Sequence, residues 1–92
     1  MNPIIEKIKE RVKAAFADVE SQEFLQQQIK KGVENHRQSF EMFKTKKPFE
    51  SFEFWKVETL LSVNLNTTTS DEIMSIGIWL IALEEFEKTN PK

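Results

Sequence analysis

Hydrophobic and polar positions follow one another along this chain with the three- and four-residue spacing of amphipathic helices. The segments KTKKP (44–48) and NLNTTTSDE (64–72) interrupt the pattern. The pattern predicts an all-α fold, a small four-helix bundle-like single domain that spans residues 1–92. The expected helices cover about residues 3–19, 22–44, 49–64 and 71–88.

Short-range signals support these boundaries. Asn2 precedes a proline, which is typical of a helix start, and Ser21 is a suitable N-cap for the second helix. Pro48 favours the start of a new element. Thr69 and Glu72 match the capping box S/T-x-x-E before the last helix.

The second predicted helix carries a long apolar stripe with near-heptad spacing, which suits packing along a neighbouring helix at a shallow angle. The stripe consists of Leu25, Ile29, Val33, His36, Phe40 and Phe43. Gly32 lies beside it in the middle of the helix, where glycine costs about 1 kcal/mol relative to alanine. We therefore expect another helix to cross closely at Gly32.

The last predicted helix contains the segment IMSIGIWLIAL (73–83), which leaves no polar face on a helical wheel. The segment is too short for the roughly 20 apolar residues of a membrane span, and acidic residues flank it on both sides. Two arrangements would cover it: a central position in the bundle, or a second protein chain, most simply a copy of itself. In the second case Met74, Ile78 and Trp79 would form the interface.

The third predicted helix has apolar residues on nearly every side. One stripe contains Phe52, Trp55, Leu60 and Val63, and another contains Phe54, Val57, Leu61 and Leu65. Aromatic residues crowd positions 40–55, and the sequence leaves open whether they form core or interface. We count Phe52, Phe54 and Trp55 among the candidate interface residues, since helices three and four together carry more apolar surface than the first two helices would cover.

Composition narrows the class of protein. The chain has no cysteine, which excludes disulfide scaffolds and thiol nucleophiles and fits a reducing compartment. Its start puts charges where a signal peptide needs an apolar segment. We therefore expect a cytoplasmic protein.

The formal net charge is −2, but residues 1–47 carry ten basic and seven acidic residues whereas residues 48–92 carry three basic and eight acidic residues. This polarity would orient an encounter with a partner, but charged residues on small domains usually solvate a face, and we favour that interpretation.

The chain offers little catalytic chemistry. His36 is the single histidine, and its helical neighbours include no carboxylate that would orient the ring or share a metal. We expect it to be a packed, hydrogen-bonded residue. The sequence has no glycine-rich phosphate loop and no Glu-x-x-His pair of a di-metal bundle. We predict no enzymatic activity, no metal and no cofactor.

Two classes of function remain once enzymatic activity is set aside. The first is a non-enzymatic protein–protein interaction module, such as a small regulator, an inhibitor, an immunity-type protein or an assembly factor, with homodimer formation through the last helix as one form. The alternative is a DNA- or RNA-binding regulator that uses the basic surface of the second helix and the 44–47 loop. Its residues would be Lys30, Lys31, Arg37, Lys44, Lys46 and Lys47. The acidic balance of the whole chain weighs against the alternative.

Overall fold

The fold is all-α, as predicted, and the helices pack against each other as a small bundle. A computed structural model describes residues 3–63 and 70–89. The helices are α1 (Pro3–Ala15), α2 (Val19–Lys46), α3 (Phe52–Leu61) and α4 (Ser70–Lys88). The start signals expected at Asn2 and Thr69 lie outside the described residues.

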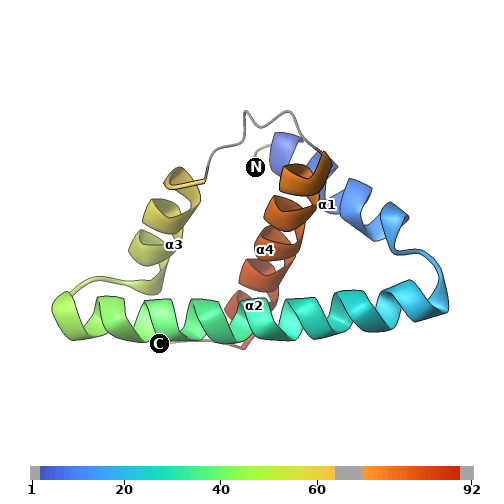
Figure 1. Cartoon of the computed structure of the whole chain (residues 1–92). Coiled ribbons are helices and arrows are strands. Elements are labelled where there is room, and N and C mark those ends of the chain that lie inside the picture. Colours follow the sequence, from blue (N-terminus) through green and yellow to red (C-terminus); the bar gives the residue numbers. More distant parts are fainter. Residues whose placement is uncertain (1–2, 64–69, 90–92) are drawn as a thin grey trace.

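The longest helix, α2, forms one side of the molecule, and the other three helices rise from it (Figure 1). In this view α4 stands between α1 and α3. Helix α4 packs against both α2 and α1, and α3 packs against α2. The amphipathic stripes thus converge on α4, which supplies the apolar surface that they share.

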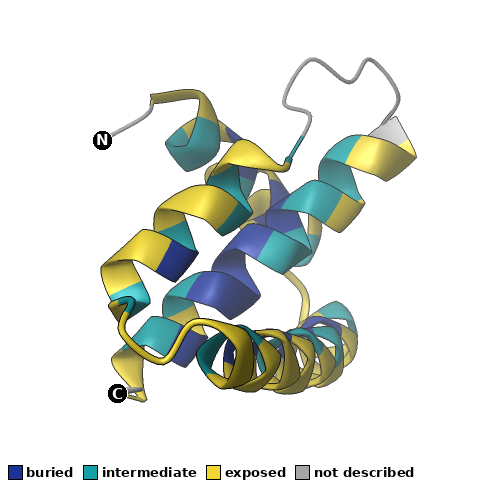
Figure 2. Cartoon of the chain, turned by 90° about the vertical axis from the view of Figure 1, so that its left-hand side faces the viewer, coloured by how far each residue is buried: buried dark blue, intermediate teal, exposed yellow. Residues whose placement is uncertain are grey.

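The core has two parts, which both include residues of α4. One part joins Val12 of α1 and Ile29 of α2 to Ile81 and Ala82 of α4. The other part joins α2 and α3 to the C-terminal half of α4 and consists of Phe40, Trp55, Leu83 and Phe86. Burial is accordingly concentrated along α4 and on the helix faces turned toward it (Figure 2). Of the two arrangements that the sequence allows for the last helix, the structure shows the central one.

Two glycines permit the close approach of the helices. A Cβ atom on Gly32 of α2 would lie 2.6 Å from the Cβ of Ala82, which confirms the predicted close crossing. On α4, a Cβ on Gly77 would overlap the Cγ2 of Val12 and lie 3.2 Å from the Cγ2 of Ile8. The small residues therefore set the distances at which α2 and α1 pack against α4.

The boundary between the first two helices differs from the prediction. Helix α1 ends at Ala15 instead of residue 19, and α2 begins at Val19 instead of residue 22. Asp18, not Ser21, is the N-cap: its carboxylate accepts a hydrogen bond from the Ser21 backbone N–H at 2.8 Å and another from the Ser21 hydroxyl at 2.9 Å. Val19 consequently lies in the first turn of α2 and is exposed.

The third helix is shorter than predicted. It begins at Phe52 instead of residue 49 and ends at Leu61 instead of residue 64. Ser51 caps it, since its hydroxyl oxygen accepts a hydrogen bond from the Phe54 N–H at 3.1 Å. In the preceding turn, the Lys44 ammonium donates to the backbone carbonyl of Glu50 at 2.7 Å. The proline at 48 therefore ends the long helix and does not begin the next one.

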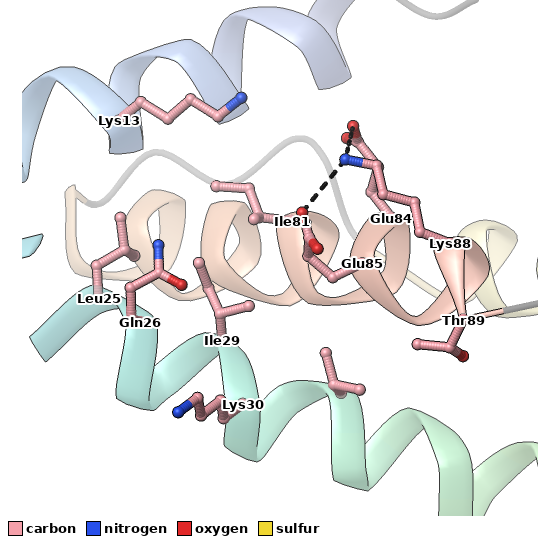
Figure 3. A pocket seen from close by; sticks show the side chains of 11 residues that line it. Lys13, Leu25, Gln26, Ile29, Lys30, Ile81, Glu84, Glu85, Lys88 and Thr89 are labelled. Atoms are coloured by element: carbon pink, nitrogen blue, oxygen red, sulfur yellow. Dashed lines mark hydrogen bonds and ion pairs between the residues drawn. The ribbon is translucent and has the colours of Figure 1, made fainter. Parts of the chain in front are cut away.

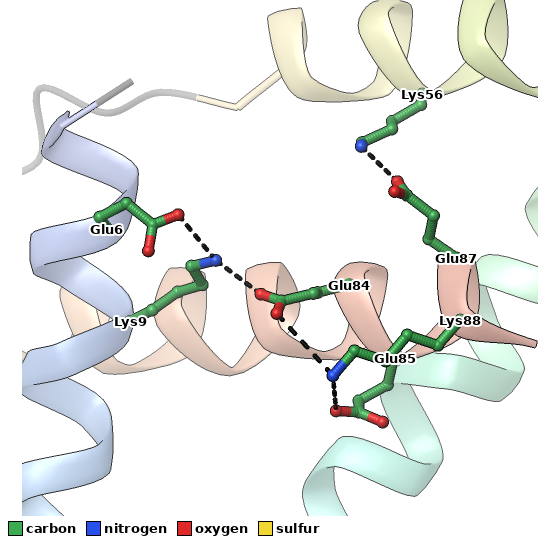
Figure 4. A network of polar contacts seen from close by, with 7 residues as sticks. All are labelled: Glu6, Lys9, Lys56, Glu84, Glu85, Glu87 and Lys88. Carbon is green, nitrogen blue, oxygen red and sulfur yellow. Dashed lines mark hydrogen bonds and ion pairs between the residues drawn. The ribbon is translucent and has the colours of Figure 1, made fainter. Parts of the chain in front are cut away.

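Charged pairs join the helices at one end of α4 (Figure 4). Lys9 of α1 bridges Glu84 of α4 at 2.6 Å and Glu6 of its own helix at 3.0 Å. The hydrogen bond from Lys9 is the main cause that lowers the pKa of Glu84. Lys56 of α3 pairs with Glu87 of α4. These pairs link the outer helices to α4 around its apolar surface.

None of the described helices combines the length and the apolar character that crossing a membrane would require.

Candidate protein interface

Helix α3 is apolar on two opposite faces, and the bundle covers one of them. Trp55 is buried and Phe52 half-buried on the inner face. On the outer face, the exposed fraction is 37% for Phe54, 53% for Val57 and 80% for Leu61. These three outer residues, spaced i, i+3 and i+7, lie along one line of the helix. We call them the α3 stripe.

Acidic side chains border the α3 stripe on both flanks. At 100° per residue, Glu53 and Glu58 fall on opposite sides of the line through Phe54, Val57 and Leu61. Both glutamates are exposed, and neither makes an ion pair within residues 3–63 and 70–89. The stripe is thus an apolar strip between two negative charges.

The N-terminal end of the stripe rests on α2. The Phe54 ring stacks on Phe43 with their centroids 6.1 Å apart, and the Lys47 ammonium lies 5.7 Å from the centroid of Phe54. The free part of the stripe is therefore its C-terminal two thirds, at Val57 and Leu61.

The aromatic cluster at residues 40–55 divides between core and surface. Trp55 is 3% exposed and packs edge-on against Phe40 and Phe86, so it lies in the core of the chain, which weighs against the prediction that places it at an interface. Phe52 also packs against Phe40, at 5.4 Å between centroids. Phe54 is the member of the three predicted aromatic interface residues that remains on the surface.

The last helix does not expose the patch expected from its sequence. Met74, Ile78 and Trp79 are half-buried and pack against the two core clusters. Within residues 71–88 no large apolar side chain is exposed. The exposed large apolar residues lie on the other helices and in the turn before α3: Ile4, Val19, Phe24, Met42, Phe49, Phe54, Val57 and Leu61. On α3 they form one line, and the sequence signal for it was the second stripe with Val57 and Leu61.

A groove of about 670 Å³ separates α3 from the C-terminal half of α2. His36, Trp55 and Trp79 form its floor, and Glu58 and Lys46 are charged residues at its edge. His36 Nε2 donates a hydrogen bond to the backbone carbonyl of Trp79 at 3.1 Å. The ring also meets Trp79 edge-on at 4.8 Å between centroids. The prediction of a packed, hydrogen-bonded histidine is confirmed.

Burial lowers the pKa of His36 below its ordinary value of 6.5, and the hydrogen bond to Trp79 opposes this effect. Between pH 6.5 and the lower pKa of the folded state, the unfolded chain binds more protons than the folded chain. We therefore expect the free energy of unfolding to fall as the pH drops below 6.5, by at most about 1.4 kcal/mol per pH unit. Urea titrations from pH 7 to about pH 5 measure this slope, since ordinary carboxylates titrate at lower pH.

Replacing His36 with glutamine, which has no titrating group, provides the control for this prediction. The His36→Gln variant should be less stable at pH 7 but should show a flat profile over the same pH interval. An equal slope in both proteins would contradict the assignment to His36.

The basic residues of the nucleic-acid alternative do not form one unpaired surface. Arg37 pairs with Glu34 and Glu41 on its own helix, and its hydrogen bonds lower the pKa of Glu34 to about 2. Lys44 donates to backbone carbonyls in the turn before α3. The remaining members, Lys30, Lys31, Lys46 and Lys47, are exposed along α2 and just after it. The alternative stays a prediction, and the engagement of Arg37 and Lys44 weighs against it.

The described residues contain no group of three or more histidine, aspartate or glutamate side chains arranged to hold a metal ion. Comparisons with protein-family models, with curated proteins and with solved structures find no significant match to the chain. The functional argument therefore depends on the surface of the molecule itself.

Proposed function

We propose that this chain is a non-enzymatic protein–protein interaction module that docks through the outer face of α3. It would act as a small regulator, an inhibitor, an immunity-type protein or an assembly factor. The observation that carries the proposal is the exposure of Val57 and Leu61, 53% and 80%, on a helix whose opposite face is buried. A helix needs only one apolar face to join a bundle, so the fold does not require apolar residues at positions 57 and 61.

The α3 stripe has the pattern of a helix that binds in a groove. Helices that insert into an apolar groove of another protein present anchors at i, i+3 or i+4, and i+7. Phe54 occupies position i, Val57 position i+3 and Leu61 position i+7. The glutamates on the flanks would then form the polar rim of the interface and favour a partner with basic residues around its groove.

The half-buried state of Met74, Ile78 and Trp79 gives less support to a homodimer through the last helix. Each of the three is less exposed than Val57 or Leu61, so a second chain would gain less apolar contact there. The stripe on α3 can be covered without any change in the fold.

A photo-crosslinking amino acid at position 61 tests the proposed function. We expect it to form defined adducts in an extract of the native cells, because Leu61 would lie within the interface. The companion substitution Val57→Lys should reduce their yield at least about tenfold, since it places a charge at the centre of the docked face. Mass spectrometry of the adducts identifies the partner, including a second copy of the chain.

The same crosslinker at Gln27, an exposed position of α2, is the matched control. It should give no adduct that depends on Val57. The absence of any adduct at position 61, or adducts that persist after Val57→Lys, would refute the proposal.

A further inference from the structure

Charge distinguishes one of the grooves between the helices from the others. The groove between α1, α3 and α4 is lined by Glu6, Glu84 and Glu87 against two lysines, and the groove between α2 and α3 by Glu58 and Lys46. A third groove, of about 610 Å³, lies between α1, α2 and α4 and is lined by three lysines and two glutamates (Figure 3).

This third groove, the lysine groove, combines an apolar floor with two lysines at its rim. Leu25, Ile29 and Ile81 line its floor. Lys13 of α1 and Lys30 of α2 extend from opposite helices beside it (Figure 3). Both lysines are exposed, and neither makes an ion pair within the described part of the chain. The lysine at position 88 pairs with Glu84 and Glu85 of its own helix.

The lysine groove and the α3 stripe are complementary in length and in charge. Seven residues separate Phe54 from Leu61, a length of about 10 Å along the helix axis, and the α2 wall of the groove from Leu25 to Val33 is about 12 Å long. The stripe offers apolar side chains between two glutamates that make no ion pair. The groove offers an apolar floor between Lys13 and Lys30, of which Lys13 also interacts electrostatically with Glu84 at the groove.

We propose that the α3 stripe of one copy docks into the lysine groove of a second copy, so that the chain associates head to tail. This inference rests on the proposed function and names its partner. The two surfaces do not meet within one molecule: α3 packs on the C-terminal half of α2 through Phe40 and Phe43, whereas the groove follows the N-terminal half of α2 from Leu25 to Val33. Each copy therefore presents one surface of each kind.

A symmetric contact of α3 with α3 fits the charges less well. In an antiparallel pair with Val57 near the two-fold axis, each flank of the helix faces the same flank of its partner. That geometry brings the two copies of Glu58 together, and like charges in an interface are unfavourable. Docking in the lysine groove places the same glutamates next to lysines.

The expected contact is small, and the association should be weak. A face of ten residues covers less than the roughly 1,200 Å² of total buried area that stable complexes show. We expect dissociation constants in the micromolar range or weaker, and a further loss of affinity in about 0.5 M salt, which screens the glutamate–lysine pairs.

Two double variants test the head-to-tail contact. The stripe variant Val57→Lys/Leu61→Lys changes only exposed residues of α3, and the groove variant Lys13→Glu/Lys30→Glu changes only exposed residues at the rim. Sedimentation velocity up to about 500 µM should show concentration-dependent association for the unchanged chain and a monomer for each variant alone. An equimolar mixture of the two variants should form a dimer and nothing larger. The stripe variant keeps an intact lysine groove, and the groove variant keeps an intact α3 stripe that can bind in it.

Each alternative outcome overturns the inference. A monomeric unchanged chain would exclude self-association, and variants that associate as strongly as the unchanged chain would place the contact elsewhere. A groove variant that still dimerises by itself, while the stripe variant is a monomer, would indicate symmetric pairing of α3. Circular dichroism checks that each variant is folded, and Glu53→Lys/Glu58→Lys replaces the stripe variant if it is not. A monomer that still forms the position 61 adducts with a different protein refutes the inference but leaves the proposed function standing.

Discussion

Replacing Trp55 with alanine should lower the free energy of unfolding by about 3–5 kcal/mol, the range for a large aromatic side chain removed from a core. The indole is 3% exposed and lies between α2 and α4, with ring contacts to Phe40 and His36 of α2 and to Phe86 of α4. Domains of this size have a total stability of about 5–15 kcal/mol, so the loss would consume a large part of it. Urea denaturation followed by circular dichroism measures the change.

Phe54→Ala is the matched control for this variant. It removes an aromatic ring from the adjacent residue of the same helix, but that ring is 37% exposed and stacks on the half-buried Phe43. We expect the free energy of unfolding to change by less than about 1 kcal/mol. Equal losses in the two variants would contradict the division of α3 into a face that packs in the core and a face that lies outside it.

Replacing Gly77 with leucine is expected to cost about 3 kcal/mol or more, near the upper end for side chains forced into a packed core. The glycine lies where α4 crosses α1, and its missing side chain leaves room for Val12, which is 0% exposed. Valine has one strongly preferred rotamer in a helix, so it cannot easily rotate away. Helix α1 would have to move outward and lose its contact with α4.

Ser75→Leu adds a similar apolar side chain to an exposed position of the same helix and should change stability by less than about 0.5 kcal/mol. A double-mutant cycle locates the conflict more closely. Val12→Ala removes the methyl group that a Cβ at position 77 would overlap, so Val12→Ala and Gly77→Ala together should cost less than the sum of the single changes. Strict additivity of the two changes would show that the overlap is not the cause.

The spacing of apolar residues along the chain was enough to predict the helices, because helical periodicity depends on neighbours three and four residues apart. The stripe of α2 from Leu25 to Phe43 was predicted completely, and its members are buried or half-buried. The close crossing at Gly32 followed from the absence of a side chain in the middle of a helix. Boundaries were less well predicted, since Asp18 and Ser21 are both good caps and only the geometry of the turn selects Asp18.

The surface that forms the candidate interface could be predicted from the sequence in part. Phe54 was named as an interface residue and remains on the surface, and the outer stripe with Val57 and Leu61 was visible in the spacing. The sequence could not rank this stripe above the one with Trp55, because the two are equally apolar. Each face of a helix is defined by local spacing, whereas the choice of which face turns inward depends on residues far away in the chain.

The amino-acid sequence by itself determined that this protein consists of helices, that it lacks cysteine and that its last helix must be covered. The tertiary structure decided how that helix is covered: α1, α2 and α3 surround it, so the large apolar residues that stay exposed lie outside α4, among them the line of Phe54, Val57 and Leu61 on α3. The physical reason is that the hydrophobic effect depends on the apolar area removed from water and not on its direction. A sequence therefore shows how much apolar surface needs cover, and only the packed fold shows which part of it is left over.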